Sequence, residues 1–271
     1  MRELERDLPA DAAPLAGEVS FSRLAVIGSG RVGRSIAGAA EEAGLAVRLA
    51  GRAEAARACR ESQIALLCVP DREIAAACAA AAAAVPPLRF VGHVSGATTL
   101  EALVPASEAG AGVFSFHPLQ TIPDGRTDLV GAPCAVAGST PAAAATARAL
   151  ALRLQMRPFA VPEDSRGAYH AAAAMASNLL VALEECAAGL VDRAGIDAPG
   201  RELLAPLVMR TAANWAERGP EALTGPIARG DSATIERHIE ALRATAPELV
   251  PVYEALAARA REVAASPEER A

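Results

Sequence analysis

Residues 24–33 read Leu-Ala-Val-Ile-Gly-Ser-Gly-Arg-Val-Gly, an apolar run followed directly by glycines in the pattern G-x-G-x-x-G. Residues 24–27 have the length and side chains of a buried strand, and residues 32–43 have the pattern of a helix that Gly44 ends. In such a turn the first glycine permits the tight bend, the second lets a pyrophosphate approach the backbone, and the third lets helix pack on strand. The helix N-terminus then faces the anion. The residues predicted to bind a dinucleotide here are Gly28, Ser29, Gly30, Arg31, Val32 and Gly33.

Apolar runs and helical patterns keep alternating through the first half of the chain. Further strands are predicted at residues 46–49, 64–69, 89–92, 113–116, 134–137 and 158–161. These runs are continuous rather than alternating, which is typical of a parallel sheet covered by helices on both faces. After Pro162 no strand pattern recurs. A helix is expected to run unbroken from there to Gly195, with others near residues 201–218, 232–244 and 247–262. The predicted fold class is therefore α/β: a doubly wound Rossmann domain (21–162) and a smaller all-α domain (163–271), after a flexible leader (1–20).

The composition excludes several classes of chemistry. All 26 basic residues among the 271 are arginines, so no lysine is available for a Schiff base, a phosphate-binding loop or a general acid. The net charge of −6 and the dispersed arginines argue against nucleic-acid binding. Five widely spaced cysteines without a C-x-x-C pair indicate a reduced compartment and no structural metal. We see no secretory signal and no convincing membrane span, and expect a cytoplasmic protein.

The choice of dinucleotide depends on the end of the second strand, which reads Ala50-Gly51-Arg52. An Asp or Glu at this place binds the ribose 2′-hydroxyl of NAD, whereas Arg52 offers a planar cation for the 2′-phosphate of NADP. The alternative is that Arg52 is an ordinary solvated arginine. We predict NADP(H), with Arg31 and Arg57 as possible additional positive charges. The residues after the third strand that we expect beside the cofactor are Val69, Pro70 and Asp71.

Only four histidines are available for proton transfer near neutral pH, and three lie in distinctive segments. His93-Val94-Ser95-Gly96 and Phe116-His117-Pro118-Leu119-Gln120 each follow a predicted strand, at the sheet edge where ligands bind. Tyr169-His170 precedes Ser177-Asn178 in the long helix, and 100° per residue puts His170 and Ser177 on one face. Each of these histidines has a structural alternative, such as a bond to backbone. A last segment contains Arg229, which either holds a substrate carboxylate or makes a structural ion pair. Asp231 is expected to cap the next helix, and His238 to serve packing.

These segments, together with Leu223-Thr224-Gly225-Pro226-x-x-Arg229-Gly230-Asp231, resemble bacterial Rossmann-like oxidoreductases with a C-terminal helical domain of unknown function. The resemblance covers about residues 23–258. It implies a place among dehydrogenases related to 6-phosphogluconate dehydrogenase, with a helical dimerisation domain, a homodimer, and an active site between domains. Some members resemble an alternative type of ketopantoate reductase. This chain departs from better-known relatives in having Ala174 and Met175 where they place a lysine.

The resulting hypothesis is NADP(H)-dependent hydride transfer to or from a small 2-oxo or 2-hydroxy acid. We expect His170, or else His117, to transfer the proton, and Ser95 and Asn178 to polarise the carbonyl oxygen. Arg229 or Gln120 would hold the substrate carboxylate, and the other residues expected to line the substrate site are Gly96, Tyr169 and Ser177. Two alternatives stay open. One is a prephenate dehydrogenase-like oxidation, although Asn178 stands where that family has a histidine, and the other is a non-catalytic NADP-binding sensor.

Overall fold

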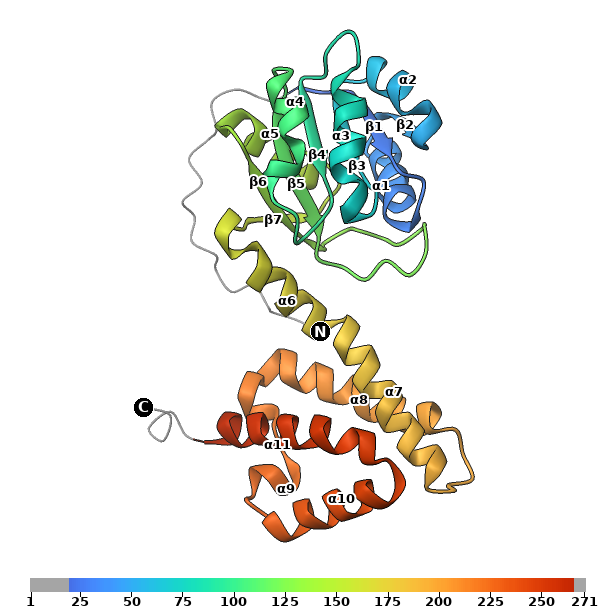
Figure 1. The fold of residues 1–271 in the computed structure, drawn as a ribbon, viewed down its shortest axis with the longest axis vertical. Helices are drawn as coiled ribbons and strands as arrows, with labels where there is room; N and C mark the ends of the chain where they lie inside the picture. The colour runs from blue at the N-terminus through green and yellow to red at the C-terminus, as the bar shows by residue number, and fades with distance from the viewer. Residues whose placement is uncertain (1–19, 266–271) are drawn as a thin grey trace. The chain divides into compact units, whose positions relative to one another are not determined.

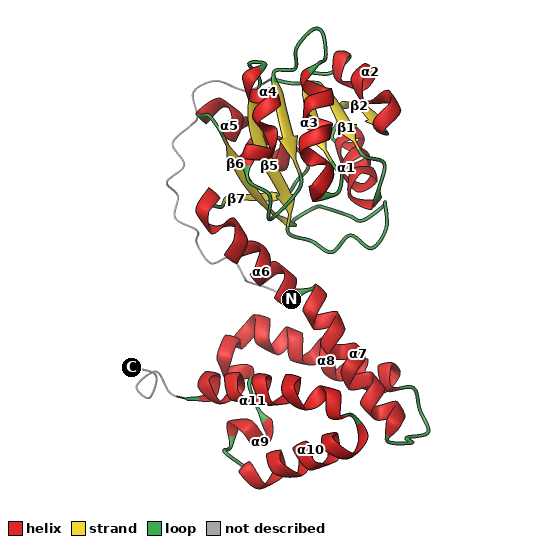
Figure 2. Ribbon diagram, viewed as in Figure 1, coloured by secondary structure: helices red, strands yellow, loops and turns green. Residues whose placement is uncertain are grey.

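The computed structural model describes residues 20–265, so most of the predicted leader lies outside the described residues. Two compact units are present, one ending at Ala174 and the other beginning at Met175. The boundary predicted at residue 162 therefore falls before the first turns of a helix that pack with the sheet. Figure 1 labels the elements of each unit, and in Figure 2 all the yellow strands belong to the first unit.

A seven-stranded sheet forms the first unit, in the order β2-β1-β3-β4-β5-β6-β7. The strands are β1 (Arg23–Ile27), β2 (Ala46–Ala50), β3 (Ile64–Leu67), β4 (Phe90–His93), β5 (Gly112–Pro118), β6 (Pro133–Gly138) and β7 (Arg157–Ala160). All neighbours pair in parallel except β5 and β6, which are antiparallel. The chain moves from β1 outward to β2 and then returns to β3 on the other side of β1. This reversal is the topological switch point, where ligands of open α/β sheets bind beyond the strands' carboxyl ends.

Helices cover both faces of the sheet, as continuous apolar strands require (Figure 2). One face packs against α1 (Arg31–Glu42) and α5 (Pro141–Arg153). The opposite face packs against α2 (Ala55–Arg60), α3 (Ile74–Ala82) and α4 (Val104–Glu108). Most helix residues in these two cores are alanines, whose small side chains let the helices lie close to the sheet. The predicted doubly wound fold is confirmed.

The long helix predicted after Pro162 is interrupted, which corrects that expectation. A short 3-10 turn, Glu163–Ser165, leads into α6 (Arg166–Ala176), and α7 (Asn178–Arg193) follows. Between them Ser177 has φ −129° and ψ −77°, outside the helical region. No glycine or proline marks the break in the sequence. Because the helix is broken there, a spacing of 100° per residue no longer places Ser177 on the same face as His170.

The same stretch, Glu163–Arg193, is long and apolar enough to cross a membrane by length and composition, with mean hydropathy 1.4 and 6% of its best window buried. This is weak evidence, because helices of water-soluble proteins pass the same test. Its first turn contains a buried arginine in contact with β5, and its second half carries Glu184 and Glu185. A packing role inside a protein fits these charges better than a lipid environment does.

The second unit is helical throughout its described part. After α7 come α8 (Gly200–Arg218), the short α9 (Gly225–Ala228), α10 (Ser232–Thr245) and α11 (Val250–Ala264). Asp231 caps α10 as predicted, since its Oδ1 accepts a hydrogen bond from the Thr234 amide at 3.0 Å. Few of this unit's apolar side chains are buried: Ala188, Ile235, Leu242, Ala246 and Ala257. Large exposed ones include Val181, Leu207 and Met209, which are each more than 60% exposed.

Candidate active site

The glycine-rich turn after β1 has the close contacts that its sequence predicts. Gly28 has φ +118°, and a Cβ there would lie 2.2 Å from the Cys68 carbonyl oxygen. A Cβ on Gly33 would lie 1.8 Å from the Gly28 oxygen, so the helix packs directly on the turn. A Cβ on Gly30 would meet nothing within 4 Å. Because Gly30 also provides no side-chain cap for α1, the first amides of the helix remain available to an anion that approaches from this side.

A cleft of about 490 Å³ opens beside this turn at the switch point. It brings together most of the predicted cofactor residues: Gly28, Ser29, Gly30, Arg52, Val69 and Pro70. Four alanines, Ala55, Ala76, Ala77 and Ala80, also line it and leave space for a flat ring system. The other predicted residues lie outside this lining: Asp71 accepts a hydrogen bond from Ser95, Arg31 is exposed with a 3.5 Å contact to the Pro123 oxygen, Val32 packs against the core and Gly33 is buried. A dinucleotide fits the turn and the cleft.

The charges around the cleft are mostly paired. Arg52 contacts Glu73 at 2.9 Å between Nη2 and Oε2, although the Arg52 side chain is 85% exposed. Arg57, expected to add positive field, instead shares Glu61 with Arg48 and lines a different cavity. Arg52 is the arginine that faces the cleft in the described part of the chain.

A polar cluster lies at the carboxyl ends of β4 and β5, and it contains Gly96, His117, Tyr169 and His170. His117 Nδ1 is 2.7 Å from the Tyr169 hydroxyl, with donor and acceptor roles set by the imidazole tautomer. The His117 and His170 ring centroids are 5.9 Å apart. Gly96 lies against both rings, because a Cβ there would be 2.7 Å from His170 Nδ1 and 2.9 Å from His117 Nε2. Three separate sequence segments therefore converge on one point of the first unit.

The Ser95 hydroxyl is fully hydrogen-bonded within the first unit. Its hydroxyl donates to Asp71 Oδ2 at 2.8 Å and accepts from the amides of Ala97 at 3.2 Å and Thr98 at 3.0 Å. One donor and two acceptor positions are all that a serine hydroxyl offers. Ser95 therefore has no capacity left to polarise a carbonyl in this arrangement. It fixes the loop that carries Gly96, and Asp71 connects that loop to Pro70 at the cofactor cleft.

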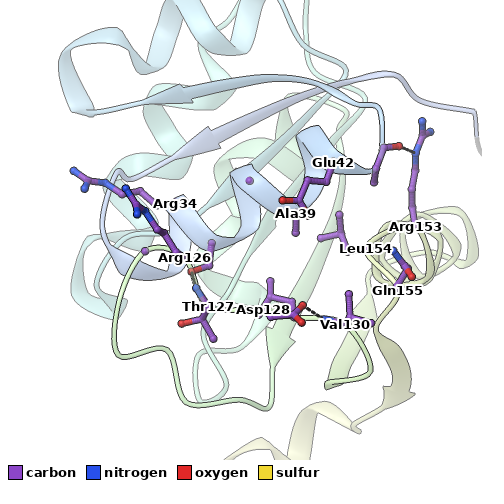
Figure 3. Close-up of a pocket in the computed structure, with 15 residues that line it drawn as sticks. Arg34, Ala39, Glu42, Arg126, Thr127, Asp128, Val130, Arg153, Leu154 and Gln155 are labelled. Atoms are coloured by element: carbon purple, nitrogen blue, oxygen red, sulfur yellow. Dashed lines mark hydrogen bonds between the residues drawn. The ribbon is translucent and has the colours of Figure 1, made fainter.

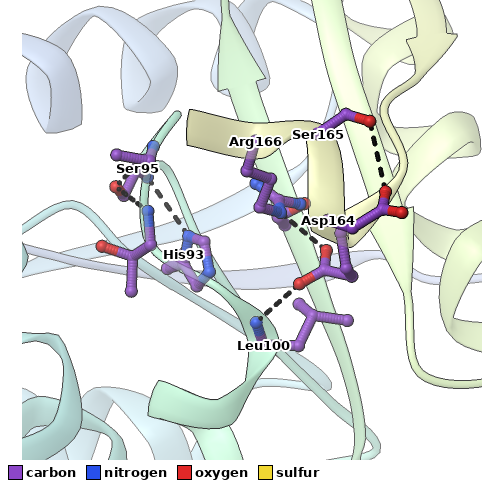
Figure 4. Close-up of polar contacts among 10 residues, drawn as sticks. His93, Ser95, Leu100, Asp164, Ser165 and Arg166 are labelled. Atoms are coloured by element: carbon purple, nitrogen blue, oxygen red, sulfur yellow. Dashed lines mark hydrogen bonds and ion pairs between the residues drawn. The ribbon is translucent and has the colours of Figure 1, made fainter. Parts of the chain in front are cut away.

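Figure 4 shows a buried arginine, Arg166, at the start of α6. Arg166, 2% exposed, contacts the Ser115 hydroxyl on β5 and pairs with Glu163 at 2.6 Å. The second oxygen of Glu163 accepts from the Leu100 amide at 3.0 Å, so this pair ties the start of α6 to the loop after β4. His93, fully buried, accepts from the Ser95 amide at its Nδ1, 3.2 Å away. Its Nε2 has no partner within hydrogen-bonding geometry.

Burial keeps two of these histidines uncharged. It lowers the pKa of His93 to about 4, assisted by the Arg166 charge. The pKa of His117 is also lowered to about 4, first by burial and then by the charges of His170 and Arg166. Burial raises the pKa of the Tyr169 hydroxyl to about 12. At neutral pH the cluster therefore presents neutral His117 and Tyr169 side chains, and His117 is a poor source of a proton.

A second cavity of about 490 Å³ lies on the other side of α1, beneath the loop between β5 and β6 (Figure 3). Ser35 fixes this loop by donating to the Asp124 oxygen at 3.3 Å and accepting from the Thr127 amide at 3.2 Å. Gln120 belongs to the same loop, and its exposed side chain accepts from the neighbouring Thr121 amide. It lies outside this cavity's lining and the cofactor cleft, and its predicted contact with a substrate carboxylate remains a prediction.

Ser177, Asn178 and Arg229 belong to the helical unit, and their part in the site also remains a prediction. Arg229 follows α9, between Gly225 and Gly230, which both have positive φ. His238 is exposed, and its Nδ1 lies 2.8 Å from the Tyr253 hydroxyl; the packing role expected for it stays a prediction. Among residues 20–265 there is no group of three His, Cys, Asp or Glu side chains placed to hold a metal ion.

Three residues of this region were not identified from the sequence. Glu163 and Arg166 have the three-residue spacing of an exposed ion pair on a helix, so nothing in the pattern distinguishes a buried arginine. Glu73 follows the predicted Asp71 by two residues, and its approach to Arg52 depends on β2 and β3 lying on either side of β1. The strand order was not predicted from the sequence.

Comparison with known proteins agrees with this architecture. Residues 48–118 match the family model of a Rossmann-like domain, and residues 132–260 match a domain of unknown function (DUF2520). The chain thus combines a Rossmann-like domain with that C-terminal domain, as its motifs indicate. The second match begins at the edge of β6, so the DUF2520 region includes strands of the sheet as well as the helical unit. No curated protein matches the chain.

Several solved structures share the fold over nearly the whole chain. A candidate NADP oxidoreductase of Bacteroides fragilis is 21% identical, with a TM-score of 0.72 over 89% of this chain and 98% of that one. A protein of Thermotoga maritima is 22% identical, with a TM-score of 0.67 and the same coverage. A reductive aminase of Aspergillus terreus, solved with NADPH and ethyl levulinate, is 20% identical, with a TM-score of 0.63 over 89% and 94% of the two chains. At these identities the likeness establishes the fold.

Proposed function

We propose that this protein is an NADP(H)-dependent oxidoreductase that transfers hydride between the cofactor and a small 2-oxo or 2-hydroxy acid, in the manner of a ketopantoate reductase. The observation that carries the proposal is the convergence of Gly96, His117, Tyr169 and His170, with Asp71 joining their loop to the cofactor cleft. The cleft, the open side of Gly30 and the arginine after β2 support NADP(H) as the cofactor. The NADPH in the Aspergillus aminase and the name of the Bacteroides protein point the same way.

When bound, the reduced cofactor supplies the hydride that the carbonyl carbon takes up. The carbonyl oxygen then needs a proton, and this chain has no lysine to donate one. His117 is held neutral by burial, so His170 is the proton donor in this proposal. Tyr169 orients His117 through their hydrogen bond, and Gly96 sets how closely the two imidazoles lie. Asn178 and Arg229 are proposed to bind the substrate oxygen and carboxylate, respectively.

Kinetics of histidine variants test the assignment. We expect His170→Ala to lower kcat at saturating ketopantoate by about 10²- to 10⁴-fold, the usual contribution of a general acid. NADPH affinity is expected to be retained. His238→Ala is the matched control, because His238 is paired with Tyr253 in the helical unit and should leave kcat unchanged. A His170→Ala enzyme with the turnover number of the wild type would exclude His170 as the proton donor.

Reduction of a carbon–nitrogen double bond is a second candidate. It is favoured by one observation: the cluster presents the neutral imidazole of His117 and the neutral phenol of Tyr169, while the neighbouring cation, Arg166, is buried and paired. An imine substrate without a carboxylate needs no exposed cation beside it. A substrate panel separates the candidates. NADPH oxidation with ketopantoate identifies a 2-oxo acid reductase, and NADPH oxidation with a ketone plus an amine identifies an imine reductase. NADP⁺ reduction with prephenate identifies a prephenate dehydrogenase. NADPH binding without turnover of any of them favours the sensor.

We also propose a cytoplasmic homodimer formed through the helical unit. That unit buries few apolar side chains in its described part, whereas Leu179, Val181, Leu207 and Met209 on α7 and α8 are each more than half exposed. Exposed apolar surface on this scale is typical of an interface. A groove of about 300 Å³ between α7 and α8, lined by Leu180, Leu204 and Val208, adds to this surface. Light scattering after size-exclusion chromatography measures the oligomeric state directly.

A further inference from the structure

The cofactor cleft contains a carboxylate that its sequence motif lacks. The end of β2 carries no Asp or Glu, but Glu73, from the turn after β3, lines the same cleft. Its Oε2 lies 2.9 Å from Nη2 of Arg52, which follows β2. Because β2 and β3 flank β1, this ion pair spans the carboxyl end of β1, where the glycine-rich turn begins.

The other charged side chains near the end of β2 form ion pairs outside the cofactor cleft. Arg48 and Arg57 both contact Glu61, at 2.8 Å and 3.3 Å, and all three line a separate cavity. Within the described residues, Arg52 and Glu73 are therefore the one charged pair that lines the cofactor cleft. The 85% exposure of Arg52 leaves its guanidinium free to exchange partners, because an exposed ion pair is weak.

We propose that Glu73 sets the preference of this cleft between NADPH and NADH by competing with the 2′-phosphate for Arg52. The 2′-phosphate dianion can accept two hydrogen bonds from the Arg52 guanidinium. It therefore displaces the Glu73 carboxylate and becomes the partner of Arg52. With NADH there is no phosphate, so Arg52 keeps its partner, and the carboxylate of Glu73 accepts a hydrogen bond from the ribose 2′-hydroxyl. The inference rests on the proposed function only in requiring that the cleft bind these cofactors, and it requires no turnover.

Binding titrations of the full-length Glu73→Gln variant test this competition. Dissociation constants are measured from nicotinamide fluorescence for NADPH and NADH, and by calorimetry for 2′,5′-ADP and 5′-ADP. We expect the Kd for NADPH and 2′,5′-ADP to fall about two- to fivefold, the range of an exposed ion pair. The Kd for NADH and 5′-ADP is expected to stay the same or rise. An unchanged or higher Kd for NADPH, or an equal fall for both cofactors, overturns the inference.

Two further variants show whether Glu73 acts through Arg52. Glu61→Gln removes the same charge from the neighbouring, separate ion-pair group and should leave the ratio of the two constants unchanged; an equal shift there would mean that net charge alone is responsible. In an Arg52→Ala background, Glu73→Gln should no longer tighten NADPH binding, and an undiminished effect contradicts competition for Arg52. If the wild-type protein binds neither cofactor, the proposed function is wrong. If the wild type binds both cofactors but Glu73→Gln does not change their Kd ratio, only the role of Glu73 is wrong.

Discussion

Gly96→Ala tests the polar cluster without removing any functional group. The added methyl would lie 2.7 Å from His170 Nδ1 and 2.9 Å from His117 Nε2, at least half an ångström inside ordinary contact at 3.4 Å. At least one ring must therefore move. Displacements of about 1 Å in a catalytic group cost on the order of 10²-fold in rate, and overpacking costs about 1–3 kcal/mol of stability. We expect kcat/KM to fall about 10- to 100-fold.

The assay is NADPH oxidation at 340 nm, together with NADPH binding by fluorescence. The Kd for NADPH should not change, because Gly96 does not line the cofactor cleft. Gly38→Ala is the control: a Cβ at Gly38 in α1 meets nothing within 4 Å, so the variant should keep full activity and gain up to about 1 kcal/mol of helix stability. Wild-type kcat/KM in a correctly folded Gly96→Ala protein would refute the placement of the reaction beside Gly96.

Three other predictions concern stability and assembly. Since the pKa values of His93 and His117 fall from 6.5 to about 4 on folding, their stabilisation is complete above pH 6.5 and is lost as pH falls toward 4, by about 3 kcal/mol each. Urea denaturation at several pH values should show this slope, and His93→Asn should reduce it; an unchanged slope would contradict the burial argument. Glu163→Ala leaves the Arg166 charge buried without a partner and should cost about 3–5 kcal/mol by urea denaturation, whereas a loss below about 1 kcal/mol would show that the pair does not anchor α6. Leu207→Glu puts a charge on the exposed face of α8 and should shift the light-scattering mass toward the monomer, and an unchanged dimer would place the interface elsewhere.

Local sequence signals predicted most of the fold because they act over short distances. Residues 24–27 have the buried, unbroken apolar character of a central parallel strand, and residues 46–49 are mostly apolar; both form strands within one residue of the predicted bounds. The Asp231 cap also follows from local chemistry. The antiparallel direction of β6 was not predicted, because hydrophobic periodicity does not report strand direction. The break at Ser177 was missed because no glycine or proline marks it.

The sequence predicts part of the candidate site, because the loops at strand ends can be placed from local patterns. Strand ends place Gly96 and His117 at one edge, so their convergence follows from the parallel topology. The saturated hydroxyl of Ser95 depends on the path of the loop that follows it, and the burial of Arg166 depends on how α6 meets β5. These are three-dimensional details that spacing along the chain does not encode. For that reason the sequence indicated which loops lie together, whereas the hydrogen bonds of Ser95 could be read only from the structure.

Hydride transfer from NADPH to a small substrate is what distinguishes the proposed enzyme from a protein that only binds the cofactor. The most direct measurement uses NADPH deuterated at C4 of the nicotinamide and follows the label by mass spectrometry and NMR. We expect ketopantoate, or another 2-oxo acid of the panel, to gain one deuterium at the former carbonyl carbon, and His170→Ala to abolish most of this transfer. A protein that binds NADPH tightly but moves no deuterium to any 2-oxo acid, ketone or imine would contradict it.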